Sequence, residues 1–272
     1  QEVRGLTLLL SPEFGSDKTL YIGNQAGLLF RSTNGGKTFA TVANLPWERG
    51  NDSPSMVISP GFATDRTLYT VADSGVYRST DAGKTWRSTT ENTPIAEASS
   101  LHIEISPNYL QDKTLFVSSH EGLFRTTDGG ERWQPVAIAN LSPERTILEG
   151  VALSPSYAQD GTVLVSLRGK GLYKSVDGGE TFAPIGDARL AFSRLYNVPC
   201  AGRPSQFSPN YANDSTIFGF GTATTDIYRS TDGGETWDIL QTPDLEPPVE
   251  VSKMRQVAIA AELYQGRILK VL

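Results

Sequence analysis

Five side chains that could do acid–base or metal chemistry recur at matched places along this 272-residue chain. They are Asn34, Asp81, Asp128, Asp177 and Asp232, and they lie 47 to 55 residues apart. Two carboxylates that face each other across a cleft can hydrolyse a glycosidic bond, and a dense cluster of carboxylates can bind a hard cation. Whether these five residues do either depends on the elements that hold them.

Each of the five residues belongs to the same eight-residue motif, which reads STDGGETW in the last copy. The copies occupy residues 32–39, 79–86, 126–133, 175–182 and 230–237. An Asp or Asn oxygen accepts hydrogen bonds from backbone N–H groups that follow it, and a Gly pair permits positive φ. The motif therefore predicts a tight turn, and we interpret its acidic residues as structural, neither catalytic nor metal-binding. Ala82 replaces the first Gly of one copy, which predicts that this position needs no left-handed backbone.

A second motif, Ser-Pro-x-aromatic-x-x-Asp-x-Thr, runs in phase with the first. We expect its aspartates to cap a turn of their own; they are Asp17, Asp65, Asp112, Asp160 and Asp214. A repeat of about 50 residues predicts one supersecondary unit arranged in a ring or a stack. Each repeat contains four short apolar or alternating runs, which indicate an antiparallel sheet. In the third repeat these runs are 101–105, 114–118, 122–126 and 133–136.

Composition excludes several classes of function. The net charge is −6 and no run of Lys or Arg occurs, so non-specific nucleic-acid binding is not expected. No stretch of 18 apolar residues is present, so we expect no direct membrane insertion. Cys200 is the sole cysteine, which rules out an intrachain disulfide, and the sequence suggests no cofactor.

The motif STDGGETW resembles the Asp-box, or BNR repeat, of sialidases, xyloglucanases, sortilin-type receptors and photosystem II assembly factors. The resemblance implies an all-β fold, a β-propeller of four-stranded antiparallel blades. We predict a single domain over 1–272 with five complete Asp-box blades at 6–45, 54–92, 101–140, 149–188 and 205–243. Residues 255–272 are predicted to form a C-terminal hairpin or a partial sixth blade. The resemblance to this family also implies a secreted, periplasmic or cell-surface location.

In a four-stranded meander both repeated motifs lie at one end, and the loops that differ between copies lie at the other. Loops on a rigid scaffold tolerate change, so we expect function at the variable end. Candidate ligand- or partner-binding residues there are Trp47, Glu48, Arg49, Asp52, His120, Glu121, Arg189, Arg194, Tyr196 and Arg203. Trp47 has a second interpretation, in which it fills the junction between the first two blades.

We predict a non-catalytic binding or scaffold propeller that recognises a protein or a glycan through this variable end, for example within a surface or envelope assembly. The alternative is a glycoside hydrolase of the Asp-box type that acts on extracellular glycans. The chain lacks the Phe/Tyr-Arg-Ile-Pro run of sialidases, and nothing in the sequence selects a pair of loop carboxylates.

Basic residues also recur at one position of the third strand of each repeat, namely Arg31, Arg78, Arg125, Lys174 and Arg229. This regular placement predicts that they brace neighbouring blades. A monomeric ring of five blades plus the terminal hairpin is favoured, and a homodimeric ring is the main alternative.

Overall fold

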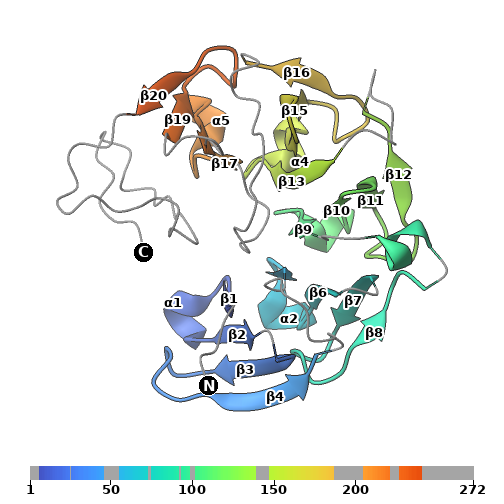
Figure 1. Ribbon diagram of the computed structural model, residues 1–272. Helices are drawn as coiled ribbons and strands as arrows, with labels where there is room; N and C mark the ends of the chain where they lie inside the picture. Colours follow the sequence, from blue (N-terminus) through green and yellow to red (C-terminus); the bar gives the residue numbers. More distant parts are fainter. Residues whose placement is uncertain are drawn as a thin grey trace. The chain divides into compact units, whose positions relative to one another are not determined.

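The computed structural model describes residues 6–24, 26–45, 55–72, 75–91, 93–98, 102–138, 147–186, 205–220 and 227–240. The chain forms two compact units, Gln1–Val136 and Ala137–Leu272. The described residues form five four-stranded antiparallel sheets, three in the first unit and two in the second (Figure 1). The predicted C-terminal strands at 255–272 lie outside the described residues.

In the first unit, the strands of each sheet pair in chain order. The first sheet contains β1 (Leu6–Leu10), β2 (Leu20–Asn24), β3 (Leu28–Ser32) and β4 (Ala40–Asn44). The second contains β5 (Met56–Ile58), β6 (Leu68–Ala72), β7 (Gly75–Ser79) and β8 (Arg87–Ser88), and the 3-10 helix η1 (Pro94–Glu97) follows it. The third contains β9 (His102–Ile105), β10 (Leu115–Ser119), β11 (Gly122–Thr126) and β12 (Gln134–Val136). The four strands predicted for the third repeat are thus confirmed to within one residue at each end.

In the second unit both sheets follow the same chain-order pairing. One contains β13 (Leu148–Leu153), β14 (Val163–Leu167), β15 (Gly171–Ser175) and β16 (Ala183–Ile185). The other contains β17 (Ser205–Phe207), β18 (Ile217–Phe220), β19 (Ile227–Ser230) and β20 (Asp238–Leu240).

The second repeated motif forms a single helical turn between the first two strands of each sheet. These turns are α1 (Phe14–Asp17), α2 (Phe62–Asp65), α3 (Tyr109–Asp112), α4 (Tyr157–Asp160) and α5 (Tyr211–Asp214). In α3, the Ser106 hydroxyl donates to Asp112 at 2.6 Å, and Asp112 accepts the N–H of Thr114 at 2.8 Å. Lys113 ends the turn with a left-handed φ of 50°. The motif aspartate therefore caps its turn, as the sequence predicts.

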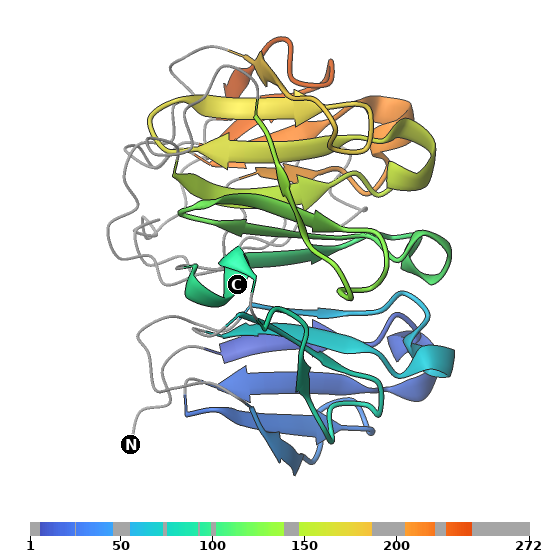
Figure 2. The same cartoon turned by 90° about the vertical axis from the view of Figure 1, so that its right-hand side faces the viewer.

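The two repeated motifs are hydrogen-bonded to each other, which explains why they recur in phase. In the third sheet, the N–H of Gly129 donates to the carbonyl of Lys113 at 3.0 Å. The equivalent bond is present in every other sheet, at 2.9 to 3.0 Å. Figure 2 shows the helical turns α1 (blue) and α2 (cyan) on the right-hand side of the first unit. Both motifs therefore occupy one end of each sheet, which we call the Asp-box end; the other is the loop end.

The sheets of each unit pack face to face, and β1 lies against β5, β5 against β9, and β13 against β17. Between the first two sheets, the buried Tyr21 and Phe62 rings meet edge-on with centroids 5.9 Å apart. Trp86, the last residue of an Asp-box, packs against this cluster. Trp237 packs in the same way between the two sheets of the second unit. Each fully buried side chain of this size contributes about 1.5–3 kcal/mol.

Candidate functional site

The carboxylate of Asp81 lies inside the turn between β7 and β8 and accepts hydrogen bonds from the chain that follows it. Its Oδ1 atom accepts the N–H groups of Lys84 at 3.0 Å and Thr85 at 2.9 Å, and its Oδ2 atom accepts the Thr85 hydroxyl at 2.6 Å. The Ser79 hydroxyl donates to Oδ1 at 2.8 Å and accepts the N–H of Gly83 at 2.9 Å. These bonds satisfy backbone groups that the turn would otherwise leave without a partner.

Asp177 and Asp232 make the same bonds in the second unit. The hydroxyl of Thr181 donates to Asp177 at 2.5 Å, and that of Thr236 donates to Asp232 at 2.6 Å. The N–H groups of the same two threonines donate to the carboxylates at 3.0 Å. A carboxylate enclosed in this way serves the backbone of its own turn.

Two copies of the turn vary this arrangement. Asp128 accepts the hydroxyl of Thr126 at 2.8 Å and the N–H of Arg132 at 2.9 Å, and the Arg132 Nε lies 3.3 Å from its second oxygen. Asn34 accepts the N–H of Thr38 at 3.0 Å, while its amide nitrogen donates to the Thr38 hydroxyl at 2.8 Å. An amide thus keeps the turn and reverses one side-chain bond.

These hydrogen bonds hold the Asp-box carboxyls in the charged form. Burial raises the pKa of Asp81, but bonds from Thr85 and its neighbours outweigh burial and lower that pKa to about 2. The same balance lowers the pKa of Asp177 to about 2. For Asp232 the Thr236 hydroxyl is the leading cause, and the pKa is again well below its usual range. The general acid of a glycosidase needs a raised pKa, so these groups are poorly suited to that role.

Ala82 overturns one prediction from the sequence. Its φ is 64°, so the position does adopt the left-handed backbone that Gly occupies in the other copies. This conformation accompanies a hydrogen bond from the preceding sheet, because the Ala82 carbonyl accepts the Tyr21 hydroxyl at 3.1 Å. The prediction was wrong because it considered only the side chain at this position. The left-handed backbone goes with a carbonyl that accepts a hydrogen bond from the neighbouring sheet.

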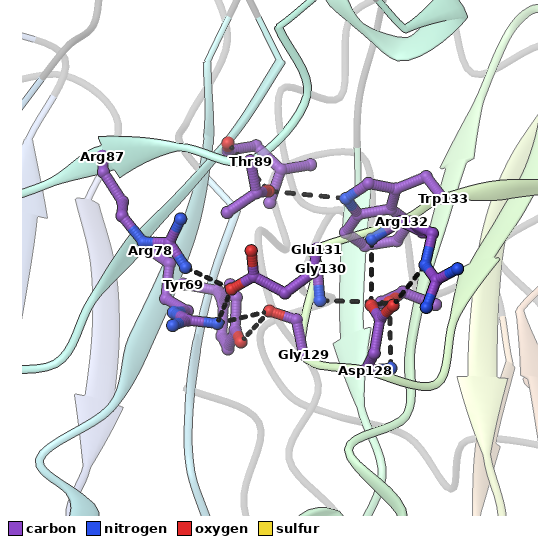
Figure 3. A network of polar contacts seen from close by, with 12 residues as sticks. Tyr69, Arg78, Arg87, Thr89, Asp128, Gly129, Gly130, Glu131, Arg132 and Trp133 are labelled. Atoms are coloured by element: carbon purple, nitrogen blue, oxygen red, sulfur yellow. Dashed lines mark hydrogen bonds and ion pairs between the residues drawn. The ribbon is translucent and has the colours of Figure 1, made fainter.

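The carbonyl of Gly129, the equivalent residue in the third copy, joins the second and third sheets (Figure 3). It accepts the Tyr69 hydroxyl at 2.7 Å and the Arg78 Nη1 at 2.9 Å. Glu131 of the same turn pairs with Arg78 at 3.1 Å and also with Arg87. The third Asp-box therefore serves as an anchor for the sheet before it.

A basic residue braces the two sheets of the second unit in the same way. The Nζ of Lys174 donates to the carbonyl of Gly233 at 2.7 Å. The prediction of a brace between neighbouring sheets is thus confirmed for Arg78 and Lys174.

A hollow of about 300 Å³ lies beside the third Asp-box. Its lining includes Asp128 and Arg132, which bond each other, and Arg125, which occupies the brace position of β11. We assign these groups to the architecture of the turn rather than to a ligand site.

Most of the binding residues predicted at the loop end lie outside the described residues; these are Trp47, Glu48, Arg49, Asp52, Arg189, Arg194, Tyr196 and Arg203. His120 and Glu121 form the turn between β10 and β11, with His120 half-buried and Glu121 exposed. The Ser119 hydroxyl accepts the N–H groups of Glu121 and Gly122, both at 3.1 Å. In the described part of the chain, no group of three or more His, Cys, Asp or Glu side chains is placed to hold a metal ion.

Three buried polar side chains, in contact one after another, were not predicted from the sequence. The Ser55 hydroxyl, just before β5, lies 2.9 Å from Nδ1 of His102, the first residue of β9. The Nε2 of His102 lies 3.2 Å from Oε1 of Glu104. Ser55, His102 and Glu104 are 8%, 6% and 8% exposed. Both strands begin at the loop end, so the chain of contacts lies at that end of the second and third sheets.

A signal for this group was present in the sequence. Counted from the Ser of the second motif, the place of Glu104 holds Leu9, Val57, Ala152 and Gln206 in the four other copies, none of them ionisable. Val57 and Ala152 are buried, so an ionisable residue at this place departs from what packing alone favours. A comparison of the copies position by position, rather than motif by motif, would have found it.

Two family models match parts of the chain. The sortilin model (Sortilin, neurotensin receptor 3) matches residues 27–141, and the BNR/Asp-box repeat model matches residues 228–238. No curated protein matches the chain by sequence.

Solved structures share the fold. The chain is similar to an ancestral GH74 enzyme, with 17% identity and a TM-score of 0.63 over 88% of this chain and 31% of the other. It is similar to the GH74 xyloglucanase from Xanthomonas campestris, with 19% identity and a TM-score of 0.61 over 88% of this chain and 38% of the other. It is also similar to the structure of YCF48 bound to D1 peptide, with 17% identity and a TM-score of 0.55 over 87% of this chain and 65% of the other. The chain therefore spans about a third of the length of these GH74 structures and has their β-propeller fold.

Proposed function

Because this chain is a β-propeller of the BNR/Asp-box repeat family, we propose that it binds a partner polypeptide through the loop end of its blades. The observation that carries the proposal is the hydrogen bonding of the repeated carboxylates. Asp81, Asp177 and Asp232 each accept hydrogen bonds from backbone N–H groups of their own turns, so we assign these carboxylates to stabilising the turns.

We expect the variable loops at the other end, where recognition can change without loss of the fold. They include the sequence LPWERGND, in which Trp47 stands outside the repeated aromatic position. Aromatic and Arg side chains are enriched among the residues that dominate protein interfaces. The similar propeller YCF48 is bound to a peptide in its solved structure, which supports a polypeptide as the ligand here.

We also propose that the protein works outside the cytoplasm, where it would meet surface or lumenal partners. Among the described residues, no helix is long and apolar enough to cross a membrane.

The test is selection of binders from a phage-displayed library of random 15-residue peptides, followed by titration of synthetic copies of the enriched peptides. We expect Trp47→Ala and Arg49→Ala, in the sequence LPWERGND, to weaken binding at unchanged melting temperature. The matched control is Lys84→Ala, an exposed residue at the Asp-box end, which should bind like the native chain.

Failure to enrich any peptide, or equal loss of binding in Lys84→Ala, would contradict the proposal. Release of reducing sugar from xyloglucan by the native chain would favour the hydrolase interpretation instead. Binding on a glycan array without peptide binding would show that the ligand is a glycan and not a polypeptide.

A further inference from the structure

The described loop end holds one group arranged as a nucleophile, a base and an orienting acid. Ser55 contributes the hydroxyl, His102 the imidazole and Glu104 the carboxylate, with contacts of 2.9 and 3.2 Å. The three come from the first strands of two adjacent sheets, and Ser55 directly precedes β5 while His102 begins β9. This group contains none of the residues proposed above to bind peptide, and its chemistry goes beyond that function.

The contacts of the His102 ring suit one placement of its proton. A carboxylate only accepts, so the tautomer with its proton on Nε2, toward Glu104, suits both contacts and makes Nδ1 an acceptor. The N–H of Ile103 donates to the Ser55 oxygen at 3.3 Å, which leaves the serine proton for Nδ1. The basic lone pair of the ring is therefore directed at the serine hydroxyl.

Burying these three polar side chains costs folding free energy, which an arrangement used only for packing would not need. All three residues are less than a tenth exposed, and an ionised carboxylate in such a place must be compensated by its partners. Equivalent strand positions hold Leu9, Val57 and Ala152 in three sheets and Gln206 in the fifth, so the fold needs no ionisable residue there. In the low dielectric of a buried site, the same contacts strengthen the pull of the ring on the serine proton.

We propose that Ser55 is an activated nucleophile, with His102 as its general base and Glu104 as the residue that positions the ring, and that the site accepts carboxylic esters. The constellation of serine, histidine and acid recurs on unrelated folds and is recognised by geometry and roles. Here the ring is reversed relative to the serine proteases, with Nδ1 rather than Nε2 toward the serine.

The reaction balances with water as the second reactant. The Ser55 oxygen bonds to the ester carbonyl carbon as its proton passes to Nδ1 of His102, and the carbonyl electron pair moves onto oxygen. That pair returns as the bond to the alkoxy group breaks, and the alcohol leaves with the proton from His102. Water, activated by the same ring, then releases the carboxylic acid and restores Ser55. Glu104 stabilises the charged ring in each step and is a positioning residue.

A fluorophosphonate probe tests the proposal, because the oxygen of an activated serine displaces fluoride from phosphorus. Intact-mass measurement and peptide mapping of the native chain should give one adduct, on Ser55. Ser106 provides an internal control, since its buried hydroxyl donates to the Asp112 carboxylate and accepts the N–H of Asn108. His102→Gln should slow labelling about 100-fold, the usual contribution of a general base.

Circular dichroism should show that His102→Gln is folded, and the comparison of Ser55 with Ser106 needs no variant at all. A folded native chain without an adduct on Ser55 would overturn the proposal, and so would labelling of His102→Gln at the native rate. Peptide binding by Ser55→Ala separates the two functions: it should persist, so loss of labelling with retained binding leaves the binding proposal intact.

Discussion

Replacing Asp81 by Asn or by Ala separates the charge of an Asp-box carboxylate from its hydrogen bonds. Asn34 shows that an amide keeps the bonds of the turn. Asp81→Asn therefore removes the charge and keeps the turn, with one side-chain bond reversed as it is at Asn34. The pKa of Asp81 falls from 3.8 to about 2, and one pKa unit corresponds to about 1.4 kcal/mol. The pKa shift thus corresponds to at most about 2.5 kcal/mol, and to about 1 kcal/mol once partial solvent exposure is allowed for.

Asp81→Ala also removes the bonds to Ser79, Lys84 and Thr85, so it should cost about 3 kcal/mol in all. Urea unfolding at pH 7, followed by tryptophan fluorescence, measures both losses. Trp86 is a local reporter, because its indole N–H donates to Gly83 of the same turn at 3.0 Å.

The sign of the pH dependence follows from the lowered pKa. The stabilisation is complete above the unfolded-state pKa, near pH 4, and is lost as the pH falls through about 2. The difference between the native chain and Asp81→Asn should therefore be full at pH 7 and vanish below pH 2. Equal costs for Asn and Ala, or a difference that survives at low pH, would refute this reasoning.

Three further substitutions test the packing around the turns. Tyr69→Phe removes a buried hydroxyl from the Gly129 carbonyl, which keeps its bond from the basic brace, so urea unfolding should show a loss of about 1–2 kcal/mol. Asn34→Asp gives the first copy the charge of the others and should raise stability at pH 7 by about 0.5–1 kcal/mol, with no gain at pH 2. Gly83→Ala should cost about 2 kcal/mol or more in melting experiments, because its left-handed backbone and two leucine side chains resist a methyl group. Gly36→Ala is its matched control: φ is also 86°, but the methyl group meets only ordinary contacts, so about 1 kcal/mol is expected.

Much of the fold was predictable because its determinants are local and repeated. The acid of each Asp-box bonds groups three or four residues away, as Asp81 does with Lys84 and Thr85, so the motif itself encodes the turn. Five copies in phase then imply five similar sheets. The brace made by Arg78 was predictable from its regular position, although its acceptor, the carbonyl of Gly129, was not.

The rest depended on contacts between residues far apart in the chain. Ser55 and His102 are 47 residues apart and meet only because adjacent sheets place their first strands side by side. The backbone of Ala82 was misjudged because its conformation goes with a hydrogen bond from Tyr21, in another sheet. The single helical turn within the second motif was expected only as a turn, since four residues give too little periodicity to reveal a helix.

Amide hydrogen exchange in Asp128→Ala tests most directly whether the repeated carboxylates hold the backbone. The N–H of Arg132 donates to Asp128 at 2.9 Å, so its exchange should accelerate by about 10- to 100-fold when the carboxylate is removed. The N–H of Val117, inside β10, should keep its native rate. An Arg132 amide that stays protected at the native level in this variant would contradict the structural role assigned to the Asp-box.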